Sequence, residues 1–395
     1  MSISGEWFIP KNLEFQKIKV RGPTEWATFS LSDSNGISGQ AEITSTQIGV
    51  SVTSLIAKLA DNLRGKKISS DYDVISFNNI SEKSLETNLP LATAVSGLRS
   101  ALSDALSRQL RIPLFLYIRL LMKDSEIKKS KVKLYANINR SMLPNEFGNV
   151  QRTPEIFGKM AKKAVENGFK TIKCAPFDEC KPGYKKKGVP AEAEIGLDRV
   201  RAIKSVVDPE INLYIDCHSR FDENSANFIA NELIDMGIDW FEEPVDPIKE
   251  KLISQKIVSN CNVPVAGGEM GYGLSTFIDL INSNSLDIVM PDIKFCGGVI
   301  EAYRIGKELE NIKKGTVSIH CPSGPISLLA SAHATLAFGN ILPLEHAVYE
   351  NNWRHKILEP FEIITEGNLK IPDGEGLGAK IDPAIIAFYG KKWSE

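Results

Sequence analysis

The segment "LYIDCHSR" at residues 213–220 is a short apolar strand that ends in charged side chains. Side chains alternate between the two faces of a strand, so Asp216 and His218 are expected on one face and Cys217 on the other. Two later apolar segments, "DWFEEP" and "PVAGGE", end in the same way at Glu242 and Glu269. The separations of 26 and 27 residues each match one strand, helix and loop. Three consecutive units therefore bring one carboxylate each to a common rim, which predicts a divalent-metal site.

The alternation of strand and helix extends outward from this segment in both directions. It runs from "VKLYANIN" to "ILPLE", with eight strand candidates and at least seven helices between residues 132 and 345. Pro154 and Gly168 mark the ends of the first helix, and Asp222 and Gly237 mark those of the third. Regular alternation indicates a parallel sheet, and eight units of this length predict a closed barrel.

The residues before the barrel follow a different pattern. Residues 1–45 read as β structure, and Ser34-Asn35-Gly36 between alternating segments is a strong hairpin signal. Trp7 and Phe8 fit either a flap or an edge strand that packs underneath. From about 46 to 112 the period is helical, with one apolar stripe at Val95, Leu98, Leu102 and Leu106.

The polar segment "MKDSEIKKSK" (122–131) predicts a linker, and residues 346–395 are punctuated by Gly and Pro. We therefore expect three parts: an α+β domain at 1–125, a barrel at 126–350 and a loop-and-strand segment at 351–395.

The composition limits the classes of function. The chain has 395 residues, of which 43% are apolar and 24% charged, and its formal net charge is −2. These values offer no general attraction to nucleic acid or to a membrane surface. The start lacks the pattern of a secretory signal, and the 6 cysteines form no CxxC pair. Several cysteines flank strand ends, which fits a zinc site, but small core residues in a reducing compartment fit better. We expect a cytoplasmic protein.

The active site of such a barrel lies at the carboxyl ends of its strands. Seven consecutive strands each end in an ionisable side chain, although each one alone could equally cap a helix or be exposed. From the second strand to the eighth they are Lys173, Asp216 with His218, Glu242, Glu269, Asp292, His320 and Glu345.

Carboxylates without clustered Cys or His ligands favour a hard cation, so Mg²⁺ is expected before Zn²⁺. Strand parity decides between Glu242 and Glu243. Trp240 and Glu242 share a face, which makes Glu242 the expected ligand and Glu243 its supporting neighbour.

A metal that chelates a substrate carboxylate draws charge from the α-carbon, and a base must then remove the α-proton. His320 is the natural base, and Asp292 on the preceding strand would orient its ring. The alternative for His320 is a buried histidine with a purely structural role. His333, His346 and His355 are expected to be structural or exposed.

These motifs resemble the enolase superfamily, and within it the mandelate racemase subgroup, over nearly the whole chain. "YIDCH", "WFEEP" and "AGGEM" match the three metal-ligand strands of that family, and "MPDIKFCGG" with "SIHCPSGPIS" matches its Asp–His dyad. "LPLE" matches the acid on the last strand, and "EGNLKIPDGEGLGAKID" matches its C-terminal return to the cap. The resemblance implies an α/β fold, a modified (β/α)7β TIM-type barrel with an α+β capping domain completed by the C-terminal segment.

The resemblance also separates activities within the family. Many members carry Lys-x-Lys on the second strand, but here Lys173 is followed by Ala175 at the second position, so a two-base racemase lacks its usual second base. His218, two residues past Asp216, matches galactonate- and mannonate-type dehydratases, in which such a histidine is the acid that expels a β-hydroxyl. The alternative is that His218 only hydrogen-bonds a neighbouring carboxylate.

The resulting hypothesis is a Mg²⁺-dependent dehydratase, a lyase that acts on an aldonic or aldaric acid. Lys173 and Glu345 would stabilise the developing ene-diolate, and Arg140 and Arg220 would contact distal hydroxyls or the carboxylate. Two alternatives are an isomerase (an epimerase or lactone cycloisomerase) on the same scaffold and a protein that binds carboxylates without turnover.

Other expectations concern partners and specificity. The partner is a small-molecule carboxylate, with no nucleic acid and no membrane, and the family implies a homo-oligomer. Lys294 is not expected to be a base, because counting back from Gly297-Gly298 places Asp292 at that position. The cluster Lys185–Lys187 fits a solvated loop better than a lure for anions. Specificity would come from cap loops at 1–25 and 46–50.

Overall fold

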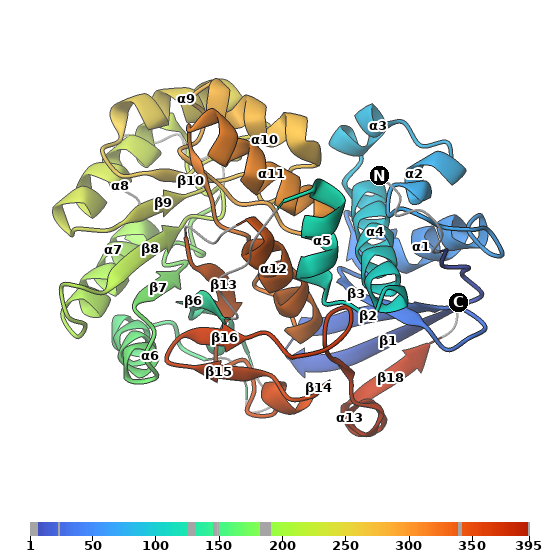
Figure 1. Cartoon of the computed structure of the whole chain (residues 1–395). Helices are drawn as coiled ribbons and strands as arrows, with labels where there is room; N and C mark the ends of the chain where they lie inside the picture. Colours follow the sequence, from blue (N-terminus) through green and yellow to red (C-terminus); the bar gives the residue numbers. More distant parts are fainter. Residues whose placement is uncertain are drawn as a thin grey trace.

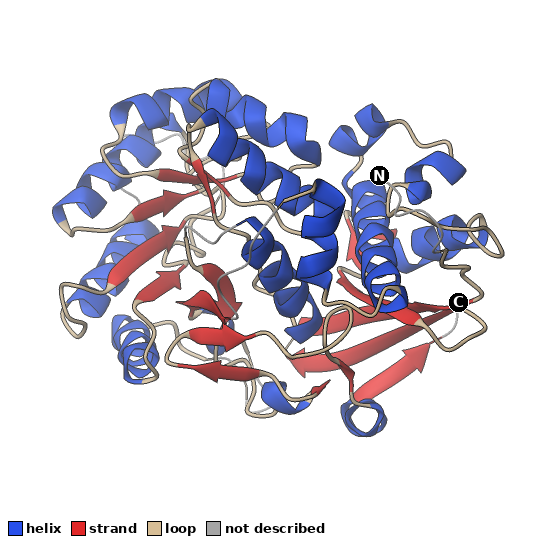
Figure 2. Ribbon diagram, in the orientation of Figure 1, coloured by secondary structure: helices blue, strands red, loops and turns tan. Residues whose placement is uncertain are grey.

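The computed structural model describes residues 7–22, 24–124, 131–144, 148, 150–181, 191–338 and 342–393. Figure 1 shows a ring of strands surrounded by helices on the left and an antiparallel sheet with its own helices on the right. Coloured by secondary structure, the left-hand part has red strands inside and blue helices outside (Figure 2). The predicted cluster Lys185–Lys187 lies outside the described residues.

Eight parallel strands form the barrel, in the order β13-β6-β7-β8-β9-β10-β11-β12. Their bounds are β6 Lys131–Asn137, β7 Thr171–Cys174, β8 Asn212–Asp216, β9 Trp240–Glu242, β10 Val265–Gly267, β11 Ile288–Val289, β12 Thr316–Val317 and β13 Leu344–Ala347. The side chain of Ser318 donates a hydrogen bond to the carbonyl of Pro343 (2.8 Å), which joins the segments after β12 and before β13. The predicted parallel barrel is confirmed.

Helices between these strands cover the outside of the barrel (Figure 2). They are α6 Pro154–Glu166, α7 Ala191–Lys204, α8 Glu223–Asp235, α9 Lys251–Asn260, α10 Gly273–Asn282, α11 Val299–Ile312 and α12 Pro325–Phe338. The expected start of α8 is present, because the Asp222 side chain accepts a hydrogen bond from the backbone N–H of Ser225, and Ser225 Oγ accepts one from the backbone N–H of Asp222. Among the residues described, none of the helices combines the length and apolar character that crossing a membrane requires.

Aromatic side chains fill the interior of the barrel below its carboxyl ends. Tyr135, Tyr214 and Trp240 pack together there, and the rings of Tyr214 and Trp240 stack at 3.7 Å. Phe241 instead belongs to the core between strands and helices. Because Trp240 points inward, Glu242 points inward as well, one pleat closer to the carboxyl end, as strand parity predicted.

The cap contains a four-stranded antiparallel sheet, in the order β18-β1-β2-β3. Its strands are β1 Asn12–Arg21, β2 Thr24–Ser32, β3 Ser38–Ile43 and β18 Gly390–Trp393. The predicted hairpin joins β2 to β3, with Gly36 at φ +87°. Phe8 is fully buried and pairs with Ile68, which favours the edge-strand interpretation over a flap for Phe8, whereas Trp7 is 45% exposed and does not pack underneath.

Five helices and a short hairpin complete the cap. They are α1 Val52–Asp61, α2 Asp73–Phe77, α3 Glu82–Thr87, α4 Leu89–Gln109 and α5 Leu114–Met122, with the strands β4 Thr46–Gln47 and β5 Val50–Ser51. Every residue of α4 from Ala92 to Ser107 is buried, not just the predicted stripe. The reason is that α4 lies between the cap sheet and α11 of the barrel, so both of its faces are covered.

The C-terminal segment contacts both parts of the molecule. It contains β14 Leu358–Glu359, β15 Ile363–Thr365, β16 Asn368–Lys370, β17 Lys380–Ile381 and α13 Pro383–Tyr389 before β18. β16 pairs antiparallel with β6, so part of this segment extends the barrel sheet, which the sequence did not predict. β18 pairs antiparallel with β1 and returns the chain to the cap (Figure 1).

Candidate active site

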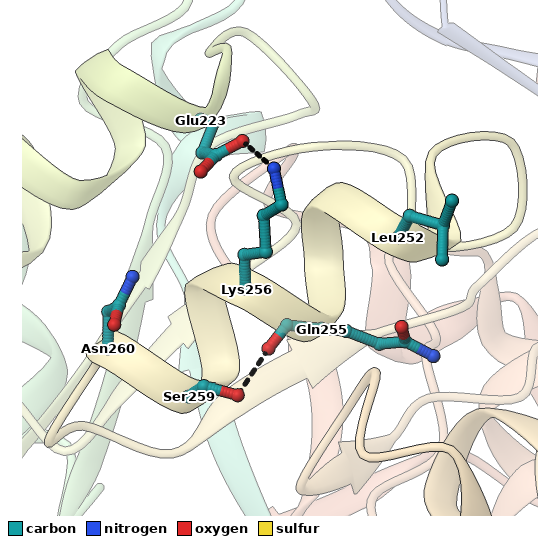
Figure 3. Close-up of a pocket in the computed structure, with 6 residues that line it drawn as sticks. All are labelled: Glu223, Leu252, Gln255, Lys256, Ser259 and Asn260. Carbon is teal, nitrogen blue, oxygen red and sulfur yellow. Dashed lines mark hydrogen bonds and ion pairs between the residues drawn. The ribbon is translucent and has the colours of Figure 1, made fainter.

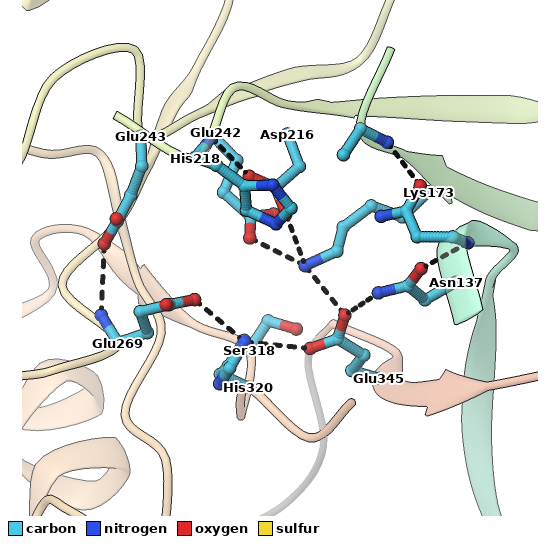
Figure 4. A network of polar contacts seen from close by, with 12 residues as sticks. Asn137, Lys173, Asp216, His218, Glu242, Glu243, Glu269, Ser318, His320 and Glu345 are labelled. Carbon is cyan, nitrogen blue, oxygen red and sulfur yellow. Dashed lines mark hydrogen bonds and ion pairs between the residues drawn. The ribbon is translucent and has the colours of Figure 1, made fainter. Parts of the chain in front are cut away.

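Lys173 is the centre of a buried cluster of charged side chains at the carboxyl ends of the strands (Figure 4). Its side chain is fully buried, and its Nζ lies 2.6 Å from Glu242 Oε1 and 2.7 Å from Glu345 Oε1. Asp216 Oδ2 is 3.7 Å from the same nitrogen. One lysine on β7 therefore gathers the carboxylates that end β8 and β9 and the carboxylate of Glu345 within β13.

His320, in the loop after β12, forms the other half of the cluster. Its Nε2 lies 2.8 Å from Glu269 Oε2 and 3.8 Å from Glu345 Oε2. Its Nδ1 lies 3.0 Å from Asp292 Oδ2. Glu345 thus links His320 to Lys173. With Asp292 and His218 included, the structure brings together eight of the ten predicted site residues, of which Figure 4 labels all but Asp292.

His218 contacts two carboxylates. Its Nε2 lies 3.0 Å from Asp216 Oδ2, and its Nδ1 lies 2.5 Å from Asp178 Oδ1. The predicted proximity to Asp216 holds, but the reason given from strand alternation is wrong. β8 ends at Asp216, and His218 lies beyond it with φ +46°, so a turn creates the contact.

Glu243 supports the end of β10 instead of entering the cluster. Its Oε1 accepts hydrogen bonds from the backbone N–H groups of Gly268 (2.9 Å) and Glu269 (3.3 Å). Glu243 therefore fixes the backbone that carries Glu269. Glu243 directly follows the last residue of β9, and successive side chains along a strand point to opposite sides, so its side chain leaves the barrel interior that Glu242 enters.

Burial and neighbouring charges set the protonation of the two histidines. Asp216 and, to a lesser degree, Asp178 raise the pKa of His218 to about 11 against the effect of burial, so the ring is protonated at neutral pH. Burial disfavours the charged form of His320, but Glu269, Glu345 and Asp292 raise its pKa well above the usual range. In this arrangement His320 is also in its charged form, with a proton on each ring nitrogen.

The carboxylates outnumber the cations, and the pKa values reflect this. Burial, followed by the charge of Asp216, raises the pKa of Glu242 well above its usual range, although Lys173 opposes this. Burial raises the pKa of Glu345 as well, but Lys173 and His320 outweigh it, so its pKa lies below the usual range and the group is ionised. The cluster therefore carries more negative than positive charge and would be stabilised by a further cation.

Two observations bear on whether the predicted ligands fit a divalent cation. Glu242 Oε2 is buried and has no hydrogen-bond partner among the described residues, and the three predicted ligands are all carboxylates, a donor type that suits Mg²⁺. As the side chains stand, however, no three His, Cys, Asp or Glu residues in the described part of the chain form a group that could hold a metal ion. Asp216 and Glu269 each pair with a histidine instead. The donor chemistry fits, and the ligand assignment stays a prediction.

The two predicted arginines have different surroundings. Arg140 Nη1 donates to Thr24 Oγ1 (3.2 Å), and Arg140 lines a cavity between cap and barrel. No hydrogen bond or ion pair within the described residues joins the side chain of Arg220 to the cluster, and its buried Nε lacks a partner there. Lys294, which we did not expect to be a base, lies 3.6 Å from Asp292 and lines the same cavity as Arg140.

His333, His346 and the cysteines have structural surroundings, whereas His355 is exposed. His333 accepts a hydrogen bond from Phe115 N and contacts the Leu377 carbonyl, and His346 is buried against Phe169. All six cysteines are free and five are buried, which fits core residues and not a zinc site.

Sequence reasoning missed two residues of the cluster. Asn137 ends β6 and donates a hydrogen bond to Glu345 Oε1 (2.7 Å). The strand-end rule would have found it if polar residues had been counted along with ionisable ones. Asp178, which contacts His218, lies in a loop after β7, and no pattern in the sequence marks it.

A second hollow lies on the outside of the barrel, between α8 and α9 (Figure 3). Lys256 and Glu223 form an ion pair across it (2.8 Å), and the neighbouring Leu252 is exposed. Its charges pair with each other, and none of the predicted site residues lines it.

Comparisons with known proteins identify the family and several relatives of this chain. A family model described as "Enolase C-terminal domain-like" matches residues 157–385. The D-xylonate dehydratase of Haloferax volcanii is 26% identical over 379 residues, which cover 93% of this chain and 86% of that protein. The D-galactarolactone cycloisomerase of Agrobacterium fabrum is 28% identical over 251 residues, or 61% of this chain and 62% of that protein.

Solved structures show the same fold. The crystal structure of a member of the enolase superfamily from Salmonella Typhimurium superposes with a TM-score of 0.82 at 20% identity, covering 98% of this chain and 100% of that one. The barrel-and-cap architecture predicted from the sequence is therefore found in an experimental structure.

Proposed function

This chain belongs to the enolase superfamily, and from that premise we propose that it is a Mg²⁺-dependent dehydratase of a sugar acid. The reaction would remove the proton α to the carboxylate and break the β-carbon–oxygen bond. The hydroxyl leaves as water, and the resulting enol becomes a 2-keto-3-deoxy acid. Such an enzyme is a carbon–oxygen lyase, like the named dehydratase relative.

The observation that carries this proposal is a pair of histidines at one cluster of carboxylates. His320 is held by Asp292, and His218 is held protonated between Asp216 and Asp178. A dehydration needs a base for the α-proton and an acid for the departing hydroxyl, and this pair supplies one candidate for each.

In the proposed site Asp216, Glu242 and Glu269 would hold Mg²⁺. When bound, the ion would draw charge from the substrate carboxylate and make the α-proton more acidic. The unpartnered Glu242 Oε2 and the raised pKa of Glu242 support a cation at this position.

His320 would take the α-proton on Nε2, because Nδ1 is held by Asp292. To act as a base it must first be neutral. Its contact with Glu269 raises its pKa, so release of Glu269 from the ring would lower that pKa and prepare the base.

Lys173 would donate hydrogen bonds to the substrate carboxylate as negative charge develops on it. Glu345 is ionised here and accepts from Asn137 and Lys173, so its support in this arrangement consists of holding Lys173 and His320 in place. His218 would then protonate the β-hydroxyl as it leaves.

A lactone cycloisomerase is the second candidate, because the relative from Agrobacterium fabrum carries that name. It would use the same α-proton chemistry without net loss of water. An epimerase would do the same but would return the acid with a changed α-carbon.

The test is to incubate the whole protein with Mg²⁺ and a panel of aldonic and aldaric acids in D2O. We expect a semicarbazide-reactive keto acid from the wild type and from a Lys249→Met control, whose side chain is 82% exposed. His320→Asn should form it at least about 10²-fold more slowly. Deuterated starting acid without a keto product would contradict the dehydratase proposal and favour an isomerase. Binding of acids without deuterium exchange or product would indicate a carboxylate-binding protein.

The expected homo-oligomer and the cytoplasmic location stay predictions. Light scattering after size-exclusion chromatography would test the first, and fractionation of the source cells would test the second.

A further inference from the structure

A cavity of about 520 Å³ lies where the cap meets the carboxyl ends of the barrel strands. Its cap wall comes from residues 24–26 and 42–46, and its barrel wall includes Arg140, Lys294 and Ser323. Lys294 follows Asp292 by two residues and Ser323 follows His320 by three. Lys294 Nζ lies 3.6 Å from Asp292 Oδ2, so one wall of the cavity borders the acid proposed to orient His320.

Lys294 supplies the first cation of this wall. Its Nζ donates to Ser323 Oγ (2.6 Å) and lies 3.6 Å from Asp292 Oδ2, beyond ordinary hydrogen-bond distance. An ammonium group has three donors, and Ser323 is its only hydrogen-bond acceptor among the described residues. Lys294 thus keeps donors for a ligand.

Arg140 supplies the second cation. Its Nη1 donates to Thr24 Oγ1, and its Nε lies 4.0 Å from Glu350 Oε1. A guanidinium has five N–H donors, so most of this capacity is unused by the described residues. Trp26 lines the same cavity, and its buried Nε1 also lacks an acceptor within the described chain.

The two carboxylates in the cavity wall are already engaged. Glu25 pairs with Lys17 and accepts a hydrogen bond from Ser45 Oγ (2.8 Å). Glu42 accepts from the backbone N–H groups of Gly324 (2.6 Å) and Ser327 (3.0 Å). These two carboxylates equal in number the cations Lys294 and Arg140, so the wall has no excess of cationic side chains. What it keeps for a ligand is the set of unused N–H donors on Lys294, Arg140 and Trp26.

We propose that this cavity binds a second carboxylate at the far end of the substrate, so that the enzyme acts on aldaric acids in preference to aldonic acids. This inference rests on the proposed dehydratase function and specifies its substrate class. Asp292 and Glu350 already offset part of the charge of Lys294 and Arg140. A terminal carboxylate with one negative charge therefore fits better than a dianionic phosphate monoester.

The test compares acids that differ only at the far end. The whole protein with Mg²⁺ is assayed for keto-acid formation with glucarate, gluconate and 6-phosphogluconate, and with galactarate and galactonate. Binding of the same acids is measured by calorimetry with His320→Asn, which is expected not to turn them over. We expect kcat/KM to be at least about tenfold higher for the better diacid than for its matched monoacid, because a charge-assisted hydrogen bond is lost.

Lys294→Met assigns the effect to the cavity. We expect it to lower kcat/KM for the diacid at least about tenfold and to leave the monoacid within about threefold, with Lys249→Met as the matched exposed control. An equal loss for both acids would mean that Lys294 acts only through Asp292 and would overturn the proposal. A preference for gluconate or 6-phosphogluconate over glucarate would overturn it as well.

The outcomes separate this inference from the proposed function. If diacids bind more tightly than monoacids in a Lys294-dependent way but no keto acid forms, the dehydratase proposal fails and the carboxylate subsite stands. If monoacids are dehydrated as well as diacids, the function stands and the subsite fails.

Discussion

Replacement of Lys173 by methionine tests the organisation of the buried cluster. Methionine is similar in length to lysine, so the substitution removes the charge with little change in packing. It leaves Glu242, Glu345 and Asp216 without the cation that lies 2.6, 2.7 and 3.7 Å from their oxygens. Breaking a buried ion pair in this way costs about 3–5 kcal/mol, because the remaining charge is uncompensated.

The pH at which this loss appears follows from the pKa of Lys173. Neighbouring carboxylates outweigh burial and raise this pKa well above its usual value. A raised pKa contributes stability in full below the unfolded-state value of about 10.4 and loses it only as pH rises through the folded-state value. The contribution is therefore complete at pH 7, where the measurement should be made.

The assay is urea unfolding at pH 7 in the presence of EDTA, followed by circular dichroism. We expect Lys173→Met to lower the free energy of unfolding by about 3–5 kcal/mol, while the exposed control Lys249→Met changes it by less than about 0.5 kcal/mol. A loss below about 1 kcal/mol for Lys173→Met would refute the reasoning, since the carboxylates would then be stable without their lysine.

Four further outcomes follow from the same contacts. His320→Asn should reduce kcat by about 10²–10⁴-fold in the keto-acid assay while retaining the circular dichroism spectrum, and unchanged kcat would exclude His320 as the base. His218→Gln should lose more stability at pH 6 than at pH 9 in urea unfolding. The pKa of His218 is about 11 in the folded protein and about 6.5 in the unfolded chain, so the stability that its charge contributes is full below about pH 6.5 and declines as pH rises toward 11. An equal loss at both pH values would contradict the ion pair with Asp216. Asn137→Ala should cost about 1–3 kcal/mol of stability by removing a donor from Glu345, whereas the exposed amide change Asn311→Ala should cost little. Mg²⁺ at about 100 times its Kd should raise the free energy of unfolding of the wild type by about 2.7 kcal/mol, and no shift with Mg²⁺ would count against the metal site.

The order of the barrel strands was predictable from the sequence because each unit carries its own signals. Pro154 and Asp222 mark helix starts, and short apolar runs mark strands, so the periodicity reports local structure. The carboxyl ends of parallel strands lie at the same end of a barrel, and this rule predicted that most of the cluster residues lie close together. Asn137 was accessible to the same rule, and only its lack of charge hid it.

Other features depend on contacts that local patterns do not report. The turn at His218, with φ +46°, is stabilised by Asp178 from another loop, so alternation along the strand gave the right neighbour for the wrong reason. The buried polar residues of α4 depend on its position between the two parts of the molecule. The pairing of β16 with β6 joins residues far apart in the chain, and a short segment such as "NLK" carries no partner information.

The pairing of β18 with β1 has a consequence for the order in which the protein forms. All of the barrel strands lie between β1 and β18 in the chain. During synthesis one edge of β1 therefore has no β18 to pair with until the barrel has emerged from the ribosome. An open edge is a template for pairing with other chains, and the exposed Lys19 and the partly exposed Lys17 on β1 discourage such contacts. Nascent chains that stall before β18 is made should therefore depend on chaperones more than released ones do.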